Sequence, residues 1–131
     1  MTEFSQNGIV EVRDLLAGQA TVCGPELTIM EAAHTMESEG IGSLGVVDDG
    51  RLVGIFTERD LVRAVADGVD VKLVAVSVYM TPDPDDLSPD VEPKEAARWM
   101  RATGYRHLPV IENGNLLGMI SMKDLMWALV G

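Results

Sequence analysis

Apolar and polar residues follow one pattern that occurs twice along this chain. In one copy, the apolar run of residues 108–111 leads to Asn113-Gly114, and a second apolar run, residues 116–120, leads to the polar stretch 121–124. Asn-Gly between two apolar runs is a strong signal for a β-hairpin, and Ser121-Met122-Lys123-Asp124 is typical of a helix start. The pattern therefore predicts strand, turn, strand and helix in succession.

The same pattern occupies residues 41–61, earlier in the chain by 64 positions and without a gap. The residues that mark turns and helix starts coincide: Gly50, Gly54, Thr57 and Asp60 recur as Gly114, Gly118, Ser121 and Asp124. Self-similarity at a fixed spacing indicates an internal duplication, and this duplication is the strongest signal in the sequence.

A helix is predicted before each hairpin. In the first copy Thr28 and Glu31 form a capping box, the apolar residues from Ile29 to Met36 share one face, and Gly40 is a typical helix end. In the second copy the helix starts at Glu92 and Pro93, because proline suits the first helical position, and it ends at Gly104. Each repeat therefore reads helix, strand, strand, helix, which predicts an α/β (α+β) fold.

The sequence divides the chain into three parts. We predict a flexible N-terminal tail over residues 1–8, a first repeat over 9–70 and a second over 71–131. Each repeat begins with a short lead-in segment, whose apolar residues are Val10, Val12, Leu15 and Leu16 in the first repeat and Val74, Val76, Tyr79 and Met80 in the second. Residues 81–93 hold four prolines and four aspartates and are expected to be a solvated connection without regular structure.

Length and charge limit the possible functions. At 131 residues with 47% apolar composition, the chain suffices for one core, whereas a repeat of about 60 residues would be marginal alone, so the repeats should pack as one unit. A formal net charge of −11 opposes binding to nucleic acid or to an anionic membrane. No apolar segment approaches the ~20 residues of a membrane span. A single cysteine, Cys23, and no secretory start predict a cytoplasmic protein.

Two hydroxyl-to-carboxylate pairs, Thr57 with Asp60 and Ser121 with Asp124, are the motifs that could carry chemistry. The ordinary interpretation is a capping box at a helix start. Aspartate is a weaker choice than glutamate for reaching back to the cap, which leaves room for a second role. A helix start offers backbone N–H groups and a positive dipole end to a phosphate, and the aspartate could accept hydrogen bonds from a ribose diol.

The stretch Arg106-His107-Leu108-Pro109-Val110-Ile111-Glu112, with Gly114, Gly118-Met119-Ile120-Ser121 and Asp124-Leu125, closely resembles the CBS (cystathionine beta-synthase) domain, and so does the first copy. A tandem pair of such domains resembles a Bateman module. The resemblance implies two repeats packed with pseudo-two-fold symmetry, clefts that bind AMP, ADP, ATP, S-adenosylmethionine or similar adenosyl ligands, and homodimers. Gly45 departs from the family pattern, which has proline there, as at Pro109.

The resemblance also assigns candidate site residues. Asp60 and Asp124 would hold ribose hydroxyls, with Thr57 and Ser121 beside ribose or phosphate. Residues at the start of each first strand would line the adenine: Ile41, Gly42, Ser43, Leu44, Tyr105 and Leu108. Four basic residues, Arg59, Arg106, His107 and Lys123, could neutralise phosphate, and the alternative is solvated surface charge.

Two functions from different classes remain. The first is a small-molecule sensor that signals through a homodimer to an unknown protein partner, and the second is a structural scaffold with vacant clefts. No catalytic or metal-binding spacing is present, so the sequence predicts neither an enzyme nor a required cofactor. Trp99 and Trp127 fall outside the predicted core faces and are either dimer contacts or buried against the lead-in segments.

Overall fold

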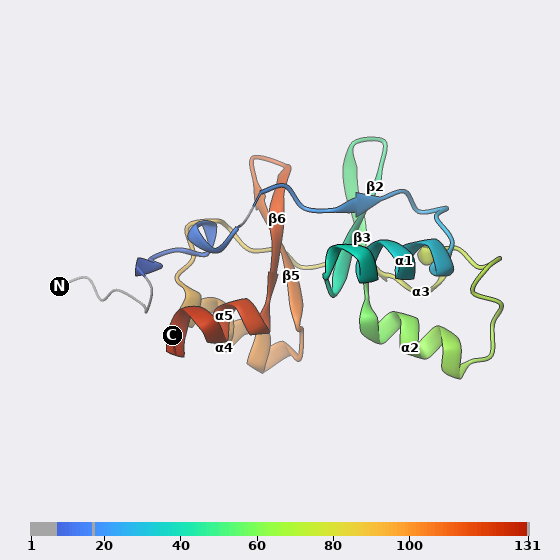
Figure 1. Cartoon of the computed structure of the whole chain (residues 1–131). Helices are drawn as coiled ribbons and strands as arrows, with labels where there is room; N and C mark the ends of the chain where they lie inside the picture. Colours follow the sequence, from blue (N-terminus) through green and yellow to red (C-terminus); the bar gives the residue numbers. More distant parts are fainter. Residues whose placement is uncertain (1–7, 17, 131) are drawn as a thin grey trace. The chain divides into compact units, whose positions relative to one another are not determined.

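The computed structural model describes residues 8–16 and 18–130, so the predicted tail lies outside it except for Gly8. In chain order the elements are η2 (a 3-10 helix, Val12–Leu15), β1 (Val22–Cys23), α1 (Ile29–Glu39), β2 (Ser43–Asp48), β3 (Arg51–Thr57), α2 (Glu58–Ala66), α3 (Val76–Tyr79), β4 (Thr81–Pro82), α4 (Pro93–Thr103), β5 (His107–Glu112), β6 (Asn115–Ser121) and α5 (Met122–Val130) (Figure 1). The predicted order of helix, strand, strand and helix is confirmed in both repeats.

The helix before each hairpin begins and ends as predicted. Thr28 and Glu31 form a reciprocal capping box at the start of α1, and Pro93 occupies the first turn of α4. Gly40 and Gly104 end these helices in the left-handed region, at φ values of 65° and 81°. Glycine is favoured there because it has no Cβ to oppose a positive φ.

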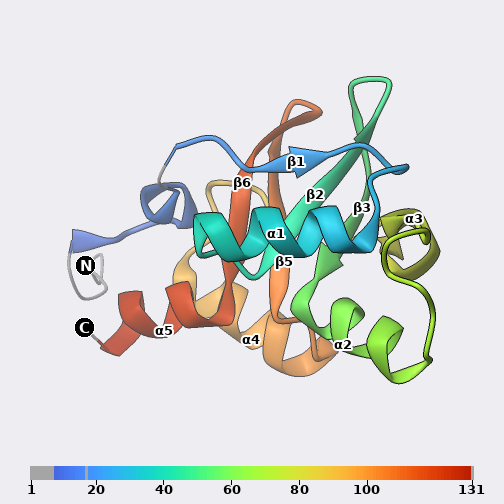
Figure 2. The same ribbon diagram turned by 45° about the vertical axis from the view of Figure 1, so that its right-hand side comes forward.

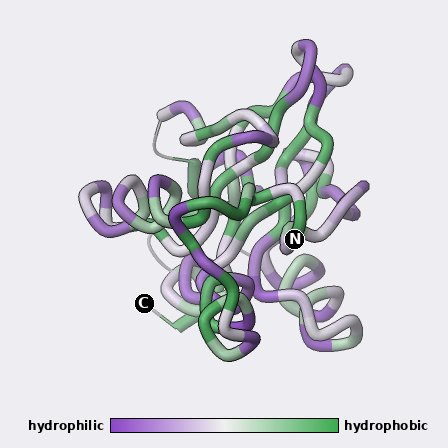
Figure 3. The backbone as a smooth tube through the Cα atoms, turned by 90° about the vertical axis from the view of Figure 1, so that its right-hand side faces the viewer, coloured by the Kyte–Doolittle hydropathy of each residue, from purple (hydrophilic) through white to green (hydrophobic). Residues whose placement is uncertain are grey.

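The two hairpins are built alike. Both turns, Asp49-Gly50 and Asn113-Gly114, have positive φ at both residues, as a type I′ turn requires. Each hairpin also shifts register at the equivalent place, between Val46 and Val47 and between Val110 and Ile111. In Figure 3 the hydrophobic colour along the strands gives way to the hydrophilic colour at the turns.

The described chain forms two compact units. Unit 2 is contiguous and holds Ala20–Pro84, whereas unit 1 joins the described part of Met1–Gln19 to Asp85–Gly131. Unit 2 has a four-stranded sheet in the order β1-β2-β3-β4, with β1 parallel to β2. Figure 2 labels the first three of these strands. Unit 1 has the two-stranded sheet β5-β6. These units differ from the sequence repeats, whose boundaries remain a prediction.

The units differ from the repeats because the lead-in segments are exchanged. The Val12 N–H, in the lead-in of the first repeat, donates to the Val91 carbonyl of the second repeat at 2.8 Å. Conversely, the Val76 N–H, in the lead-in of the second repeat, donates to the Leu27 carbonyl of the first repeat at 2.8 Å. Each lead-in therefore completes the structure of the other repeat.

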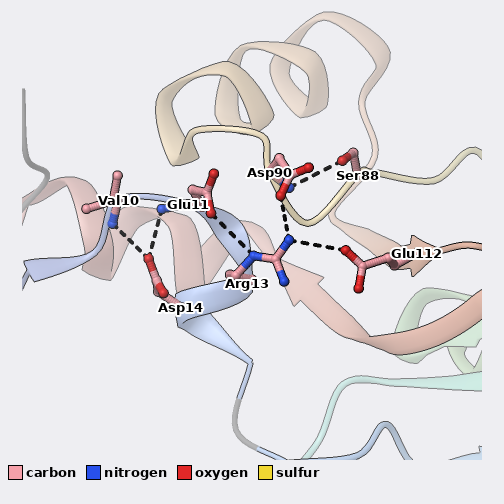
Figure 4. Close-up of polar contacts among 7 residues, drawn as sticks. All are labelled: Val10, Glu11, Arg13, Asp14, Ser88, Asp90 and Glu112. Carbon is pink, nitrogen blue, oxygen red and sulfur yellow. Dashed lines mark hydrogen bonds and ion pairs between the residues drawn. The ribbon is translucent and has the colours of Figure 1, made fainter. Parts of the chain in front are cut away.

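An ion-pair cluster ties the first lead-in to unit 1 (Figure 4). One Arg13 nitrogen, Nη2, lies 2.5 Å from Asp90 and 3.2 Å from Glu112, and Nε donates to Glu11 at 3.3 Å. Asp90 and Glu112 raise the pKa of Arg13 above its ordinary value, chiefly through the hydrogen bond to Asp90. Asp14 in turn accepts from the backbone N–H groups of Val10 and Glu11, which lower its pKa.

Each unit has its own apolar core. The buried members in unit 2 are Ile29, Ala32, Met36, Leu44, Val46, Phe56, Ala64 and Val76. Those in unit 1 are Val12, Leu87, Ala96, Met100, Leu108, Val110, Ile120 and Leu125. Fully buried Ala32 and Ala96 let α1 and α4 approach their neighbours closely, because an alanine side chain occupies little space.

The expectation that residues 81–93 form only a solvated connection was wrong. Thr81–Pro82 pair with β3, so the segment contains a short edge strand. Leu87 belongs to the core of unit 1 and forms a parallel bridge to Val110. Prolines at an edge are compatible with strand pairing, and the proline count therefore gave too strong an argument against structure.

Candidate functional site

In each unit the start of the first hairpin strand lies beside the start of the following helix. Ser43 pairs with Thr57 across β2 and β3, and the Gly42 carbonyl accepts a hydrogen bond of 3.1 Å from the N–H of Glu58. We call residues 41–44 and 57–60 junction 1. The structure thus brings together the predicted site residues of the first repeat.

The second repeat has the same arrangement. His107 pairs with Ser121 across β5 and β6, and the Arg106 carbonyl accepts a hydrogen bond of 2.9 Å from the N–H of Met122. We call residues 105–108 and 121–124 junction 2. Each junction lies within one unit, so its geometry depends on that unit alone.

Both hydroxyl-to-carboxylate pairs are capping boxes, as the ordinary interpretation predicted. The Thr57 N–H donates to Oδ2 of Asp60 at 2.8 Å, and the Asp60 N–H donates back to the Thr57 hydroxyl at 3.4 Å. The corresponding distances for Ser121 and Asp124 are 3.0 and 3.1 Å. These contacts fix the carboxylates at the helix starts, which orients them whether or not they have a second role.

The two carboxylates differ in accessibility. Asp60 is 1% exposed, and its Oδ1 forms an ion pair with Arg63 one turn along α2. Asp124 is partly exposed, and its Oδ2 accepts the hydrogen bond from the Ser121 N–H. Sequence reasoning missed Arg63, although its three-residue spacing from Asp60 on a helix was the available signal.

The predicted adenine-lining residues have different environments. Leu44 and Leu108 are core residues, 0% and 1% exposed, so only their backbone could face a ligand. Ser43 is also buried, whereas Ile41, Gly42 and Tyr105 are partly exposed. The Tyr105 hydroxyl hydrogen-bonds to Asp85, which raises the pKa of the tyrosine. Their role against adenine stays a prediction.

The basic residues lie beside the junctions. Arg59, Arg106 and Lys123 are exposed, and His107 is partly exposed. The N–H groups of the first and third residues of α2 and α5 already have acceptors. These are the carbonyl of the residue just before β2 or β5, and the cap hydroxyl. The second residue, Arg59 or Lys123, therefore carries the N–H that remains for an external anion.

Other kinds of site find no support in the described residues. Within 8–16 and 18–130, no group of three His, Cys, Asp or Glu side chains is arranged to hold a metal ion. None of the helices in those ranges has the length and apolar character to cross a membrane. Burial raises the pKa of the Cys23 thiol, which makes it a poor nucleophile near neutral pH.

Comparison with known proteins gives consistent matches along nearly the whole chain. The family model described as "CBS domain" matches twice, at residues 12–67 and 74–131. An uncharacterised 17.7 kDa protein of Acidianus ambivalens is 41% identical over 122 residues, which is 92% of this chain and 73% of that protein.

Solved structures agree with this result. The CBS-domain-containing protein ATU1752 of Agrobacterium tumefaciens is 40% identical, with a TM-score of 0.85 over 90% of this chain and 98% of the other. The CBS domain pair of protein MJ0100, in complex with methylthioadenosine and S-adenosylmethionine, is 25% identical, with a TM-score of 0.81 over 89% and 97%. The duplicated hairpins with their capped helices, together with two matches to one family, show that this chain belongs to the CBS domain family as a tandem pair.

Proposed function

We propose that this chain is a regulatory module without catalytic activity, which binds an adenosyl ligand at its junctions and signals as a homodimer. The observation that carries the proposal is the Asp124 carboxylate, which the capping box holds at the helix start while the side chain remains partly exposed. A CBS domain pair of the same fold is seen with two adenosyl compounds, which supports this ligand class.

The physical basis is a fixed acceptor beside a helix start. A carboxylate that is already oriented binds a diol at low entropic cost, and a hydrogen bond to a charged group contributes about 1.5–3 kcal/mol. The helix dipole and the N–H of Lys123 favour a phosphate on the same ligand. Arg106, whose carbonyl accepts from the Met122 N–H at the helix start, offers a guanidinium. AMP, ADP, ATP and S-adenosylmethionine all fit this description, and no resident cofactor is needed.

A thermal-shift screen with these four compounds tests the proposal. A ligand present at 100 times its dissociation constant should stabilise the chain by about 2.7 kcal/mol and raise the melting temperature. The matched control is 2′,3′-dideoxyadenosine, which keeps the base but lacks the diol. The proposal is wrong if no adenosyl compound raises the melting temperature, or if Asp124→Asn and Asp60→Asn both bind as tightly as wild type.

The second candidate is a dimeric scaffold that needs no ligand, and the exposed tryptophans favour it. Trp99 on α4 is 46% exposed and Trp127 on α5 is 52% exposed. Tryptophans of this kind are enriched in protein–protein contacts. A chain that dimerises with the same affinity in the presence and absence of every adenosyl compound would support the scaffold over the sensor. In either case we place the protein in the cytoplasm, without nucleic acid or membrane as partner.

A further inference from the structure

The two repeats place different side chains three residues after the candidate ribose-binding aspartate. Arg63 follows Asp60 on α2, whereas Trp127 follows Asp124 on α5. Residues three apart on a helix are neighbours on its surface, so this position faces the carboxylate in both repeats. One repeat therefore supplies a cation to its aspartate and the other an aromatic ring.

At junction 1 the acceptor capacity of the carboxylate is already used. Oδ2 of Asp60 accepts from both the N–H and the hydroxyl of Thr57, at 2.8 and 3.1 Å. Oδ1 is held by the Arg63 guanidinium. With the carboxylate 1% exposed, a ribose hydroxyl reaches it only after Arg63 moves away.

Junction 2 lacks this obstacle. Oδ2 of Asp124 accepts from the Ser121 N–H at 3.0 Å, and the side chain remains partly exposed. An indole ring carries no charge, so Trp127 cannot form an ion pair with Asp124 as Arg63 does with Asp60. The carboxylate at junction 2 is therefore the one ready to accept a diol.

We infer that Arg63 is an internal lock on junction 1, so that the chain binds a single adenosyl ligand, at junction 2. The inference rests on the proposed function and adds the residue that determines which repeat binds. The lock persists because displacing Arg63 would leave a buried carboxylate without its counter-charge, which is costly unless the ligand supplies an equivalent cation. Arg63 is itself 60% exposed, so the lock can be opened from solvent without unfolding the helix.

Reciprocal substitutions test the lock, with calorimetric titration of 5′-methylthioadenosine as the measurement. This probe has a ribose diol and no phosphate, so the result does not depend on phosphate contacts. Wild type should bind one molecule per chain, and Asp124→Asn should abolish that binding. Arg63→Ala should bind two per chain, and the double variant Arg63→Ala with Asp60→Asn should return to one.

Trp127→Arg tests the same idea in the other repeat, where no buried ion pair is broken. The new arginine should pair with Asp124 and weaken binding about tenfold or more, because a hydrogen bond to a charged acceptor is lost. Arg98→Ala on α4 is the control for Arg63→Ala, because both variants remove an exposed arginine from a helix. Circular dichroism melting of each variant establishes that it is folded.

The outcomes separate the inference from the proposed function. If wild type binds no adenosyl compound, the proposed function itself is wrong. The lock is overturned, with the function intact, if wild type binds two molecules per chain. It is also overturned if Arg63→Ala still binds one molecule per chain and Trp127→Arg binds with the same affinity as wild type. If Arg63→Ala does not fold, Trp127→Arg alone decides, and wild-type affinity there overturns the lock.

Discussion

The Met80 side chain fills the space that a side chain on Gly54 would need. A Cβ built on Gly54 would meet the Met80 sulfur directly and would stand 3.0 Å from the Thr81 carbonyl oxygen. The equivalent pair in the second repeat is Leu16 over Gly118, where a Cβ would lie 2.7 Å from the Leu16 Cδ2 methyl. Each second hairpin strand therefore accepts the last apolar side chain of a lead-in segment.

Gly54→Ala should destabilise the fold by about 1–3 kcal/mol, the usual range for overpacking, because the backbone of Thr81 cannot retreat without breaking the β3–β4 pairing. Gly118→Ala should cost less, because only the flexible end of Leu16 has to move. Urea unfolding measures both. Gly24→Ala is the control, since its Cβ would meet nothing within 4 Å. A Gly54→Ala variant as stable as Gly24→Ala would contradict the close approach.

Arg13→Ala should release the first lead-in segment without unfolding the rest of unit 1. Arg13 contacts three carboxylates that are far apart in sequence, and its removal leaves them mutually repelling. The amide hydrogens of Val12 and Arg13, which donate to Val91 and Pro89, should then exchange faster with solvent. Hydrogen exchange followed by mass spectrometry measures this change. Equal protection in Arg13→Ala and wild type would show that the apolar contacts of Val12 are enough to hold the first lead-in segment in place.

Glu31→Gln should make the protein less stable near neutral pH and should have little effect in acid. The Thr28 hydroxyl and N–H donate to the Glu31 carboxylate and lower its pKa below the ordinary value of 4.5. A group whose pKa is lower in the folded state contributes stability above its unfolded pKa, and this contribution is lost as the pH falls through the folded value.

Urea unfolding of wild type and Glu31→Gln at about pH 7 and about pH 3 tests this sign, because the difference between them should shrink at the lower pH. Glu37→Gln, on the same helix but outside the capping box, is the control. A difference that grows in acid would mean that the carboxylate acts in its protonated form instead.

Trp99→Glu and Trp127→Glu should shift the proposed homodimer towards monomer. Both side chains are about half exposed, on α4 and α5, and burying a charge at an apolar contact without a partner is unfavourable. Light scattering across a concentration series measures the mass. Val78→Glu, at an exposed apolar residue of unit 2, shows whether the effect is specific to unit 1. A monomeric wild type at every concentration would remove the basis of this prediction.

Arg106→Ala should weaken AMP binding while leaving 5′-methylthioadenosine binding unchanged. Only AMP carries a phosphate, and in a chain of net charge −11 an anion needs local positive charge. The salt dependence of AMP affinity should fall in the variant. Equal AMP affinity in wild type and Arg106→Ala at two salt concentrations would assign Arg106 to the solvated surface.

Local signals made most of the fold predictable. The caps at Thr28 and Gly40 and the turn at Asn113-Gly114 depend on residues within a few positions of one another, and the sequence shows these directly. The duplication then allowed each element to be checked against its copy. The contact of each aspartate with its own cap residue, Asp60 with Thr57 and Asp124 with Ser121, was predictable for the same reason.

Long-range relationships were not predictable in this way. Arg13 and Asp90 are 77 residues apart, and nothing in the composition of either segment indicates that they meet. Leu87 lies among prolines and aspartates, and its burial depends on a bridge to Val110 that only the folded chain provides. The Arg63 contact was visible as a spacing, but many such spacings on helices are solvent-exposed and carry little energy.

The exchange of lead-in segments sets an order for folding during synthesis. Unit 2 is a continuous stretch, so all of its strands and helices are available once residue 84 has left the ribosome. Unit 1 joins residues 12–16 to α5, so the first lead-in segment waits while more than a hundred residues are added before α5 is complete. The apolar side chains of Val12 and Leu16 remain uncovered during that interval. The first lead-in segment is thus buried later than unit 2, although it is made before unit 2.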